Sequence, residues 1–386
     1  MTSLALVRDI LDQLISFDTT SHYSNLDLID WIEARLTPLG FQCERIANEA
    51  GTKANLWARI GPDVPGGLVL SGHTDVVPVE GQDWHTDPFQ MIEKTGKLYG
   101  RGVADMKGFI ALCLAFAPEF AKLDLTTPIH FAFSYDEEVG CQGAPAMINR
   151  LIAQGAQPSA VWVGEPTLWQ VVSGHKGIVL TEVEVFGHEA HSSLTHLGVS
   201  AIDEAVDLMA VLRAIAADLV ANAPPDTPFD PPHPTLTIGL LSGGTASNIL
   251  ARHCRFVFDL RCPPDYDPDE ILTPFFEAAN KADARLKARF PECAVNITRL
   301  SNAPALAIDR ASPAESLLRA LTGDNELRAV AYATEAGQFN VAGIPAVVCG
   351  PGSIDQAHIP NEWIELTELS KGVEIFSELT KRLAQP

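Results

Sequence analysis

The feature that most constrains the fold is an alternation of short apolar runs with stretches of helical spacing along the first half of the chain. Apolar residues recur at helical intervals over residues 4–16, 24–39, 106–122 and 142–153. Short apolar runs, which indicate buried strands, lie at 54–60, 67–71, 129–135 and 159–164. Strands that alternate with helices in this way predict an α/β domain with a mostly parallel sheet flanked by helices.

The pattern changes near residue 178, where IVLTEVEVFG alternates apolar and polar side chains with period two. That period is typical of a strand whose sheet has one solvated face. The elements expected after it are a helix over 199–222, strands over 235–241 and 254–260, a helix over 268–289 and a strand near 294–299. The order β-α-β-β-α-β predicts a ferredoxin-like unit.

After residue 300 the chain returns to α/β character, with the apolar run IPAVVCG and a closing helix from residue 366. We therefore expect one α/β domain, formed by residues 1–178 and 301–386. An inserted α+β domain, residues 179–300, interrupts it. A length of 386 residues agrees with two domains, since single cores stop growing at about 250–300 residues.

Composition and charge exclude several classes of function. The formal net charge of −22 disfavours nucleic acid and anionic membranes as partners. No apolar stretch is long enough to span a membrane, and the first residues form an amphipathic pattern that contains charges, unlike a signal peptide. The seven cysteines form no CxxC pair, so we expect a reduced, cytoplasmic protein.

Ionisable side chains follow several of the apolar runs or lie in glycine-rich turns. They are His73 and Asp75 in SGHTDVVP, Asp105 in GRGVADMKG, Asp136, Glu137 and Glu138 in FSYDEEVG, Glu165 in VWVGEPT, and His358 in DQAHIPNE. Taken singly, each has an ordinary explanation as a hydrogen-bonded histidine or a solvated turn. Since α/β proteins bind ligands at the carboxyl ends of their strands, the whole set is expected to converge on one site.

Histidine and carboxylate ligands without cysteine suit zinc, manganese or cobalt. Two histidines and several carboxylates are too many for one catalytic zinc, which takes three protein ligands. They fit two ions about 3.5–4 Å apart that share a bridging carboxylate, with a further carboxylate free to act as general base. Other chemistries are disfavoured, because GRGVAD lacks the third glycine of a dinucleotide loop, HEAH is one residue short of HExxH, and no GxSxG occurs.

The motifs HTD, GRGxxDMKG, DEExG, GEPT, GHxxHSS and GPGSxxQAH together resemble the dinuclear-zinc amidohydrolases. This family includes acetylornithine deacetylase, succinyl-diaminopimelate desuccinylase, aminoacylase and carboxypeptidase G. The resemblance covers nearly the whole chain, including the inserted domain. The stretches YATEAGQF (332–339) and CGPGSIDQAHIPNEWI (349–364) are most similar to the acetylornithine deacetylase members.

The resemblance implies a role for each matching residue. Two Zn²⁺ ions, which Co²⁺ or Mn²⁺ could replace, would be held by His73, Asp105, Glu138, Glu165 and His358, with Asp105 as the bridge. Asp75 would lie behind His73 and fix its tautomer, and Glu137 would be the general base. The residues implied near the substrate are His191 at the oxyanion, Asn248, Arg261 at the α-carboxylate, and Gly350. As a separate hypothesis, Glu335 or Asp355 would attract an ornithine ammonium group.

The implied reaction is hydrolysis of the amide bond of an N-acyl amino acid, with N2-acetyl-L-ornithine giving L-ornithine and acetate. Deacylation of acetylcitrulline, acetylmethionine or a succinyl-diaminopimelate type of substrate stays open. So does a catalytically silent metal-binding relative. The inserted domain is expected to act as a lid and to form a homodimer, in which His191 serves the partner's site.

Overall fold

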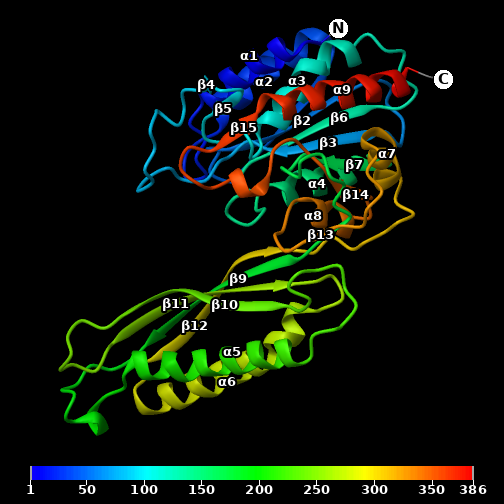
Figure 1. Ribbon diagram of the computed structural model, residues 1–386. Coiled ribbons are helices and arrows are strands. Elements are labelled where there is room, and N and C mark those ends of the chain that lie inside the picture. Colours follow the sequence, from blue (N-terminus) through cyan, green and yellow to red (C-terminus); the bar gives the residue numbers. More distant parts are fainter. Residues whose placement is uncertain (1, 385–386) are drawn as a thin grey trace. The chain divides into compact units, whose positions relative to one another are not determined.

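The structure is a computed structural model that describes residues 2–384, which divide into two compact units (Figure 1). Unit 1 comprises the described residues up to Gly174, the segment Leu306–Arg328, and the described residues from Thr334 onward. Unit 2 comprises His175–Ala305 and Ala329–Ala333. Each unit has a hydrophobic core of its own.

Unit 1 is built on a mixed sheet. In order across the sheet, its strands are β1 (Gln42–Ala47), β2 (Ala54–Ile60), β6 (Ile129–Ser134), β3 (Leu68–His73), β7 (Ala160–Val163) and β14 (Ala346–Val348). The pairs β6–β3, β3–β7 and β7–β14 are parallel, whereas β1–β2 and β2–β6 are antiparallel. The expected α/β fold with a mostly parallel sheet is confirmed, with an antiparallel hairpin at one edge.

Alternating side chains along these strands face two helical layers. Leu70, Phe131 and Trp162 belong to the main core, and their strand neighbours point to the opposite face. The core-side helices are α1 (Leu4–Ile15), α2 (Leu26–Leu36), α3 (Lys107–Phe120), α7 (Pro313–Thr322) and α9 (Leu366–Leu383). The helices that pack against the other face are α4 (Ala144–Ala153) and α8 (Ala336–Val341).

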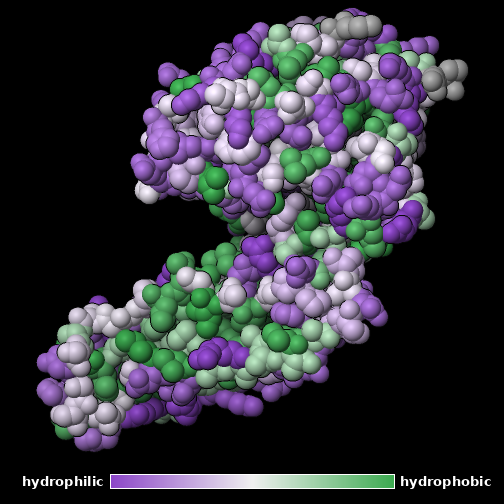
Figure 2. All heavy atoms as spheres, in the orientation of Figure 1, coloured by the Kyte–Doolittle hydropathy of each residue, from purple (hydrophilic) through white to green (hydrophobic). Residues whose placement is uncertain are grey.

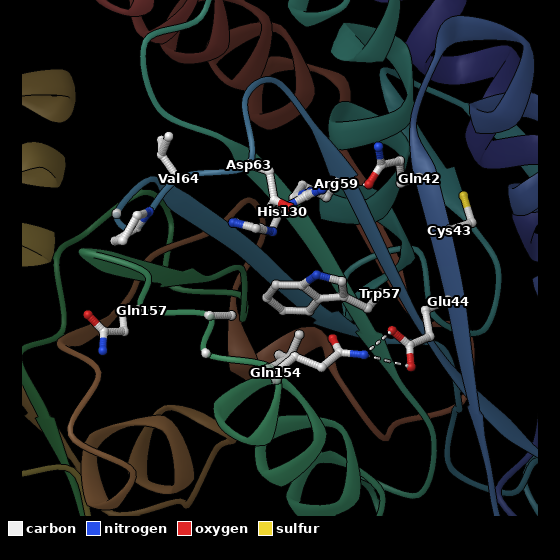
Figure 3. A pocket seen from close by; sticks show the side chains of 15 residues that line it. Gln42, Cys43, Glu44, Trp57, Arg59, Asp63, Val64, His130, Gln154 and Gln157 are labelled. Carbon is white, nitrogen blue, oxygen red and sulfur yellow. Dashed lines mark hydrogen bonds and ion pairs between the residues drawn. The ribbon is translucent and has the colours of Figure 1, made fainter.

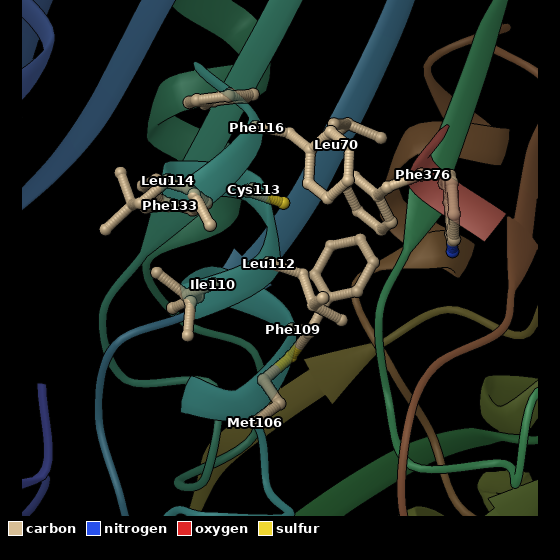
Figure 4. Close-up of a cluster of buried hydrophobic side chains, with 14 of the residues drawn as sticks. Leu70, Met106, Phe109, Ile110, Leu112, Cys113, Leu114, Phe116, Phe133 and Phe376 are labelled. Carbon is tan, nitrogen blue, oxygen red and sulfur yellow. The ribbon is translucent and has the colours of Figure 1, made fainter. Parts of the chain in front are cut away.

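Helix α3 forms the centre of the core of unit 1. Its residues from Lys107 to Ala117 are all buried, as expected for a helix that is apolar on every side. It packs against α1, α9 and β3, and Phe109 contacts Phe376 of α9 with ring centroids 5.8 Å apart (Figure 4). Because the first turn of α3 follows Asp105 closely, this packing anchors one end of the loop that contains Asp105.

Unit 1 differs from the sequence expectation in several places, since β1, α7 and α8 were not expected either. The helix expected over 24–39 ends as an α-helix at Leu36 and continues as a single 3-10 turn, Thr37–Leu39, because Pro38 cannot donate a helical hydrogen bond. A small sheet was not expected at all; its strands are β4 (Ile92–Lys94), β5 (Lys97–Tyr99) and β15 (Trp363–Glu365). These strands have three residues each, too few for a periodic signal.

Unit 2 has the element order β-α-β-β-α-β. Its elements are β9 (Gly177–Phe186), α5 (Ala201–Ala221), β10 (Thr235–Gly243), β11 (His253–Cys262), α6 (Pro268–Arg289) and β12 (Ala294–Ala303). The antiparallel strands are ordered β10-β11-β9-β12. Burial alternates strictly along β9, and its inner valines pack in the core against α5 and α6. A separate two-residue ladder joins β8 (Gly174–His175) and β13 (Ala329–Val330).

Local sequence signals explain where the long helices of unit 2 begin. The Ser200 hydroxyl accepts a hydrogen bond from the backbone of Asp203, and the Asp267 carboxylate accepts one from Asp269. Pro268 occupies the first turn of α6, where its missing N–H has no cost. Among the residues that the structure describes, no helix is both long and apolar enough to cross a membrane.

Candidate metal centre

The candidate metal ligands lie where parallel strands of unit 1 end. His73 is the last residue of β3, which lies between β6 and β7. The segment with Glu137 and Glu138 follows β6, and Glu165 lies two residues beyond β7. Since these three strands are parallel, their carboxyl ends share one edge of the sheet, which is where α/β proteins bind ligands.

Asp105 lies between two histidines and presents one carboxylate oxygen to each. Its Oδ1 is 3.0 Å from His73 Nε2, and its Oδ2 is 3.2 Å from His358 Nε2. The same His358 nitrogen is 2.9 Å from Glu138 Oε2. His73 Nε2 is 3.9 Å from Glu165 Oε1. The structure thus brings all five predicted ligands into one cluster, although His358 comes from the far end of the chain.

Two overlapping groups within the cluster could hold metal ions. One is His73, Asp105 and Glu138, and the other is His73, Glu137 and Glu165. In each group, one ligand atom per residue lies within 4.8 Å of the others. Glu137 is therefore as close to a possible ion as a ligand would be, and its assignment as the general base stays a prediction.

The orientation of His73 is set by a backbone group. Its Nδ1 lies 2.9 Å from the carbonyl oxygen of Asp75 and 3.7 Å from the Asp75 carboxylate. A carbonyl only accepts, so Nδ1 carries a proton, and Nε2 is the ring nitrogen that faces Asp105. The carbonyl of Asp75 is thus nearer to Nδ1 than the carboxylate of the same residue, and a role of that carboxylate in fixing the tautomer stays a prediction.

The Asp75 carboxylate instead holds the acidic segment. Its Oδ1 accepts a hydrogen bond from the backbone N–H of Glu137 (3.1 Å), and its Oδ2 accepts one from that of Glu138 (3.2 Å). The Ser21 hydroxyl donates to Asp75 Oδ2 at 2.7 Å. Lys53 forms an ion pair with Asp136 at 2.5 Å, which holds the start of the acidic segment in place. Sequence reasoning missed Ser21 and Lys53, which lie in a turn and a loop, respectively, without any distinguishing pattern.

Burial and like charges dominate the electrostatics of the cluster. Burial raises the pKa of Glu137 to about 8 and the pKa of Glu138 to about 7. Burial, together with the charge of Asp105, raises the pKa of Glu165 well above its usual range. Burial acts in the same sense on Asp105, but hydrogen bonds from His358 and His73 outweigh it and hold the pKa of Asp105 below its usual range.

The residues present fit a pair of divalent cations. Glu165 Oε1 is buried and has no hydrogen-bond partner among the described residues, a costly state that a bound cation would relieve. Buried carboxylates outnumber the histidines that face them, so positive charge is missing from the cluster. The donors are nitrogen and oxygen, the set that zinc, manganese and cobalt accept.

Glu335 and Gly350 lie close behind the strand ends. The Glu335 carboxylate is buried and accepts hydrogen bonds from the hydroxyls of Ser71 (3.1 Å) and Ser134. Both of its oxygens are therefore engaged inside the protein, and its binding of a substrate amine stays a prediction. A Cβ on Gly350 would lie 2.1 Å from the carbonyl oxygen of Gly164, so only glycine fits against the segment that leads into Glu165.

The remaining predicted residues belong to unit 2. His191 and Asn248 lie on adjacent segments, since His191 bridges Ile249 and the backbone of Ser192 donates to the Asn248 carbonyl at 3.0 Å. Both are exposed. Arg261 is near the other end of β11 and donates to Asp259 at 3.2 Å. The stretch of β11 from His253 to Arg261 spans roughly 26 Å at about 3.3 Å per residue, and the segment of Asn248 precedes its other end.

A pocket of about 550 Å³ lies elsewhere in unit 1, between the β1–β2 hairpin and the end of α4 (Figure 3). Its charged groups are already paired, because Arg59 binds Asp63 and Gln42, and Glu44 accepts hydrogen bonds from Gln154. Burial lowers the pKa of His130, another lining residue, to about 4. None of the predicted site residues lines this pocket, and its groups suggest no chemistry.

The fold and the cluster together define a class: an α/β protein whose clustered histidines and carboxylates could hold divalent metal ions. Comparison with known proteins identifies the family. Residues 69–382 match the model of peptidase family M20/M25/M40, and the chain belongs to that family. It is therefore a hydrolase of the amidohydrolase and peptidase type, which confirms the resemblance noted in the sequence.

Its relatives include acetylornithine deacetylases. The one from Myxococcus xanthus is 35% identical over 373 residues, covering 95% of this chain and 94% of the relative. The one from Proteus mirabilis is 32% identical over 390 residues, covering 98% and 96%. Among solved structures, an M20 family metallo-carboxypeptidase from Sulfolobus solfataricus has a TM-score of 0.78 at 16% identity, covering 98% of this chain and 99% of that one. A dinuclear metal-binding peptidase from Bacillus subtilis, with 13% identity, has a TM-score of 0.62 and covers 98% of this chain and 97% of its own.

Proposed function

We propose that the protein removes the acetyl group from N2-acetyl-L-ornithine with the help of two bound zinc ions. The observation that carries the metal part is Asp105, which turns one oxygen to His73 (3.0 Å) and the other to His358 (3.2 Å), the arrangement of a bridging carboxylate. The acetylornithine deacetylases among the relatives, which align over nearly the full length, support the substrate.

Two bound cations would polarise the amide carbonyl and lower the pKa of a nearby water. Glu137 takes a proton from the attacking water while the water oxygen bonds to the carbonyl carbon. Cys141 Sγ lies 3.1 Å from Glu137 Oε1 and donates to it, which leaves the second oxygen for that proton. Glu137 then passes the proton to the amide nitrogen as the C–N bond breaks, and the products are acetate and L-ornithine.

Unit 2 supplies the groups for the rest of the substrate in this proposal. Arg261 pairs with the α-carboxylate, and His191 with Asn248 stabilises the oxyanion. The separation of Arg261 from His191 along β11 supports a site completed by two copies of the chain. The edge strand β10, with Leu240 and Leu241 at 57% and 60% exposure, is the surface we propose for the homodimer. Figure 2 shows apolar residues gathered over this unit.

The location proposed for the enzyme is the cytoplasm. All seven cysteines are free, including six that are buried, which agrees with a reducing compartment.

The test is the rate of free-amine release by zinc-loaded protein from N2-acetyl-L-ornithine. Nα-acetyl-L-methionine and N-succinyl-L,L-diaminopimelate are measured beside it, each with and without a chelator. Chelator-sensitive turnover that is fastest on acetylornithine is the expected result. Faster turnover on another substrate would refute the proposed substrate and keep the metal chemistry, and the absence of turnover on all three would refute the proposed deacetylase activity.

A further inference from the structure

The loop that contains Asp105 turns its backbone N–H groups towards one buried carboxylate, that of Glu362. Oε2 of Glu362 accepts from Gly102 N at 2.9 Å. Oε1 accepts from Ala104 N at 2.9 Å and from Asp105 N at 3.1 Å. Glu362 has no exposed surface, so these bonds form away from water, where charge-assisted hydrogen bonds are strong.

A fourth partner, Arg101, extends this arrangement to the segment of His358. Arg101 donates to Glu362 Oε2 at 2.9 Å and to Gln82 Oε1 at 2.5 Å. Gln82 in turn donates to the backbone carbonyl of His358 at 2.8 Å. Arg101 and Glu362 are both almost fully buried. The ion pair therefore connects the loop of Asp105 with the segment of His358, although the two lie about 250 residues apart in sequence.

The alternative is that the Arg101–Glu362 ion pair only stabilises the fold. The pair of Glu315 and Arg319 is an example of such a structural ion pair in this protein. Glu315 is 3% exposed and binds Arg319 at 2.8 Å within helix α7. Its contacts hold one helix turn and no loop of the metal centre. The backbone partners of Glu362 are different, because all three lie in the four residues that end with Asp105. A buried pair that served stability alone could be replaced by apolar side chains of similar volume.

We propose that Glu362 is a positioning residue, which holds the loop so that the Asp105 carboxylate faces both His73 and His358. This inference rests on the proposed metal centre. Glu362 is not itself a ligand, and it contacts the predicted ligand Asp105 through the backbone N–H of that residue. Partners that orient metal ligands typically change metal affinity by about 10- to 100-fold when they are lost. The effect acts on metal binding, so it can be measured without any substrate.

The experiment compares Glu362→Gln with the matched control Glu315→Gln in the full-length protein. The glutamine amide keeps the volume but presents an NH₂ group to backbone donors that need an acceptor. The dissociation constant for Zn²⁺ is measured by competition with a chromophoric chelator, and the Co²⁺ absorption spectrum reports ligand geometry. We expect zinc affinity to fall about 10- to 100-fold in Glu362→Gln, with a changed Co²⁺ spectrum, and to stay near wild type in Glu315→Gln.

Thermal unfolding of the metal-free proteins separates positioning from general destabilisation. Unchanged zinc affinity in Glu362→Gln would overturn the proposal, and so would an equal loss in both variants. If Glu362→Gln does not fold, Glu362→Asp replaces it, since a carboxylate withdrawn by one methylene cannot reach both sides of the loop. Wild-type protein that binds zinc without hydrolysing acetylornithine would refute the proposed substrate alone, while wild-type protein that binds no metal would overturn both proposals.

Discussion

Gly164 offers a test of how closely the core supports the metal centre. A Cβ at this position would lie 2.0 Å from Phe109 Cγ and 2.1 Å from Cδ1, whereas ordinary contacts begin near 3.4 Å. In Gly164→Ala the ring must therefore retreat by about 1.4 Å. It has no room to do so, because Phe109 is fully buried with the rings of Trp162 and Phe376 at 5.4 and 5.8 Å. Overpacking of this kind typically costs 1–3 kcal/mol, and we expect about 3 kcal/mol here.

The assay is urea unfolding of a double-mutant cycle with Phe109→Ala, which removes Cγ and both Cδ atoms, the atoms that a Cβ on residue 164 would meet. We expect Gly164→Ala to cost at least about 1 kcal/mol less in the Phe109→Ala background, since contacting residues couple by about 0.5–3 kcal/mol. Gly239→Ala is the control, because its Cβ would meet nothing within 4 Å. Additive costs of the two substitutions would refute the reasoning. Metal affinity is measured in parallel, since a backbone that yields in place of the ring would displace Glu165, the next residue.

Three further outcomes are expected. Glu137→Gln should lower kcat by about 10²- to 10⁴-fold with bound metal retained, and a loss of metal instead would make Glu137 a ligand. Because burial lowers the pKa of His130 to about 4 from 6.5, the unfolded chain binds its proton first as the pH falls. Stability should therefore decline from pH 6.5 to 4, by at most about 3 kcal/mol for this residue, and His130→Gln should show a shallower decline in urea unfolding at each pH. Chelation should lower the unfolding free energy by about 2.7 kcal/mol relative to protein with metal at 100 times its Kd, and an unchanged calorimetric transition would contradict the metal centre.

Much of the metal centre could be predicted because its ligands follow recognisable strands. His73 and Glu165 come after apolar runs, and the principle that parallel strands end at one edge brings them together without any knowledge of the intervening chain. The fold could be predicted for a similar reason, since β9 alternates strictly and α3 is apolar from Phe109 to Ala117.

The supporting contacts could not be predicted. Glu362 acts on residues about 260 positions away, and nothing in its local sequence distinguishes it from a solvated acid. The role of Asp75 depends on whether its backbone carbonyl or its carboxylate lies nearer to His73 Nδ1. The backbone conformation between the two residues decides this. Such contacts depend on tertiary geometry, whereas sequence patterns report local periodicity.

The position of unit 2 in the chain has a consequence for synthesis on the ribosome. Strand β14 pairs with β7, yet about 180 residues, including all of unit 2, separate them in sequence. At about 5–20 residues per second, roughly 10–40 s pass between the emergence of the two strands. By the end of that interval all the main strands and helices of unit 2 have been synthesised, and the unit can fold. Until β14 emerges, β7 has no partner strand on one of its edges. The nascent chain therefore acquires its last predicted ligand, His358, only after all of unit 2 has been synthesised.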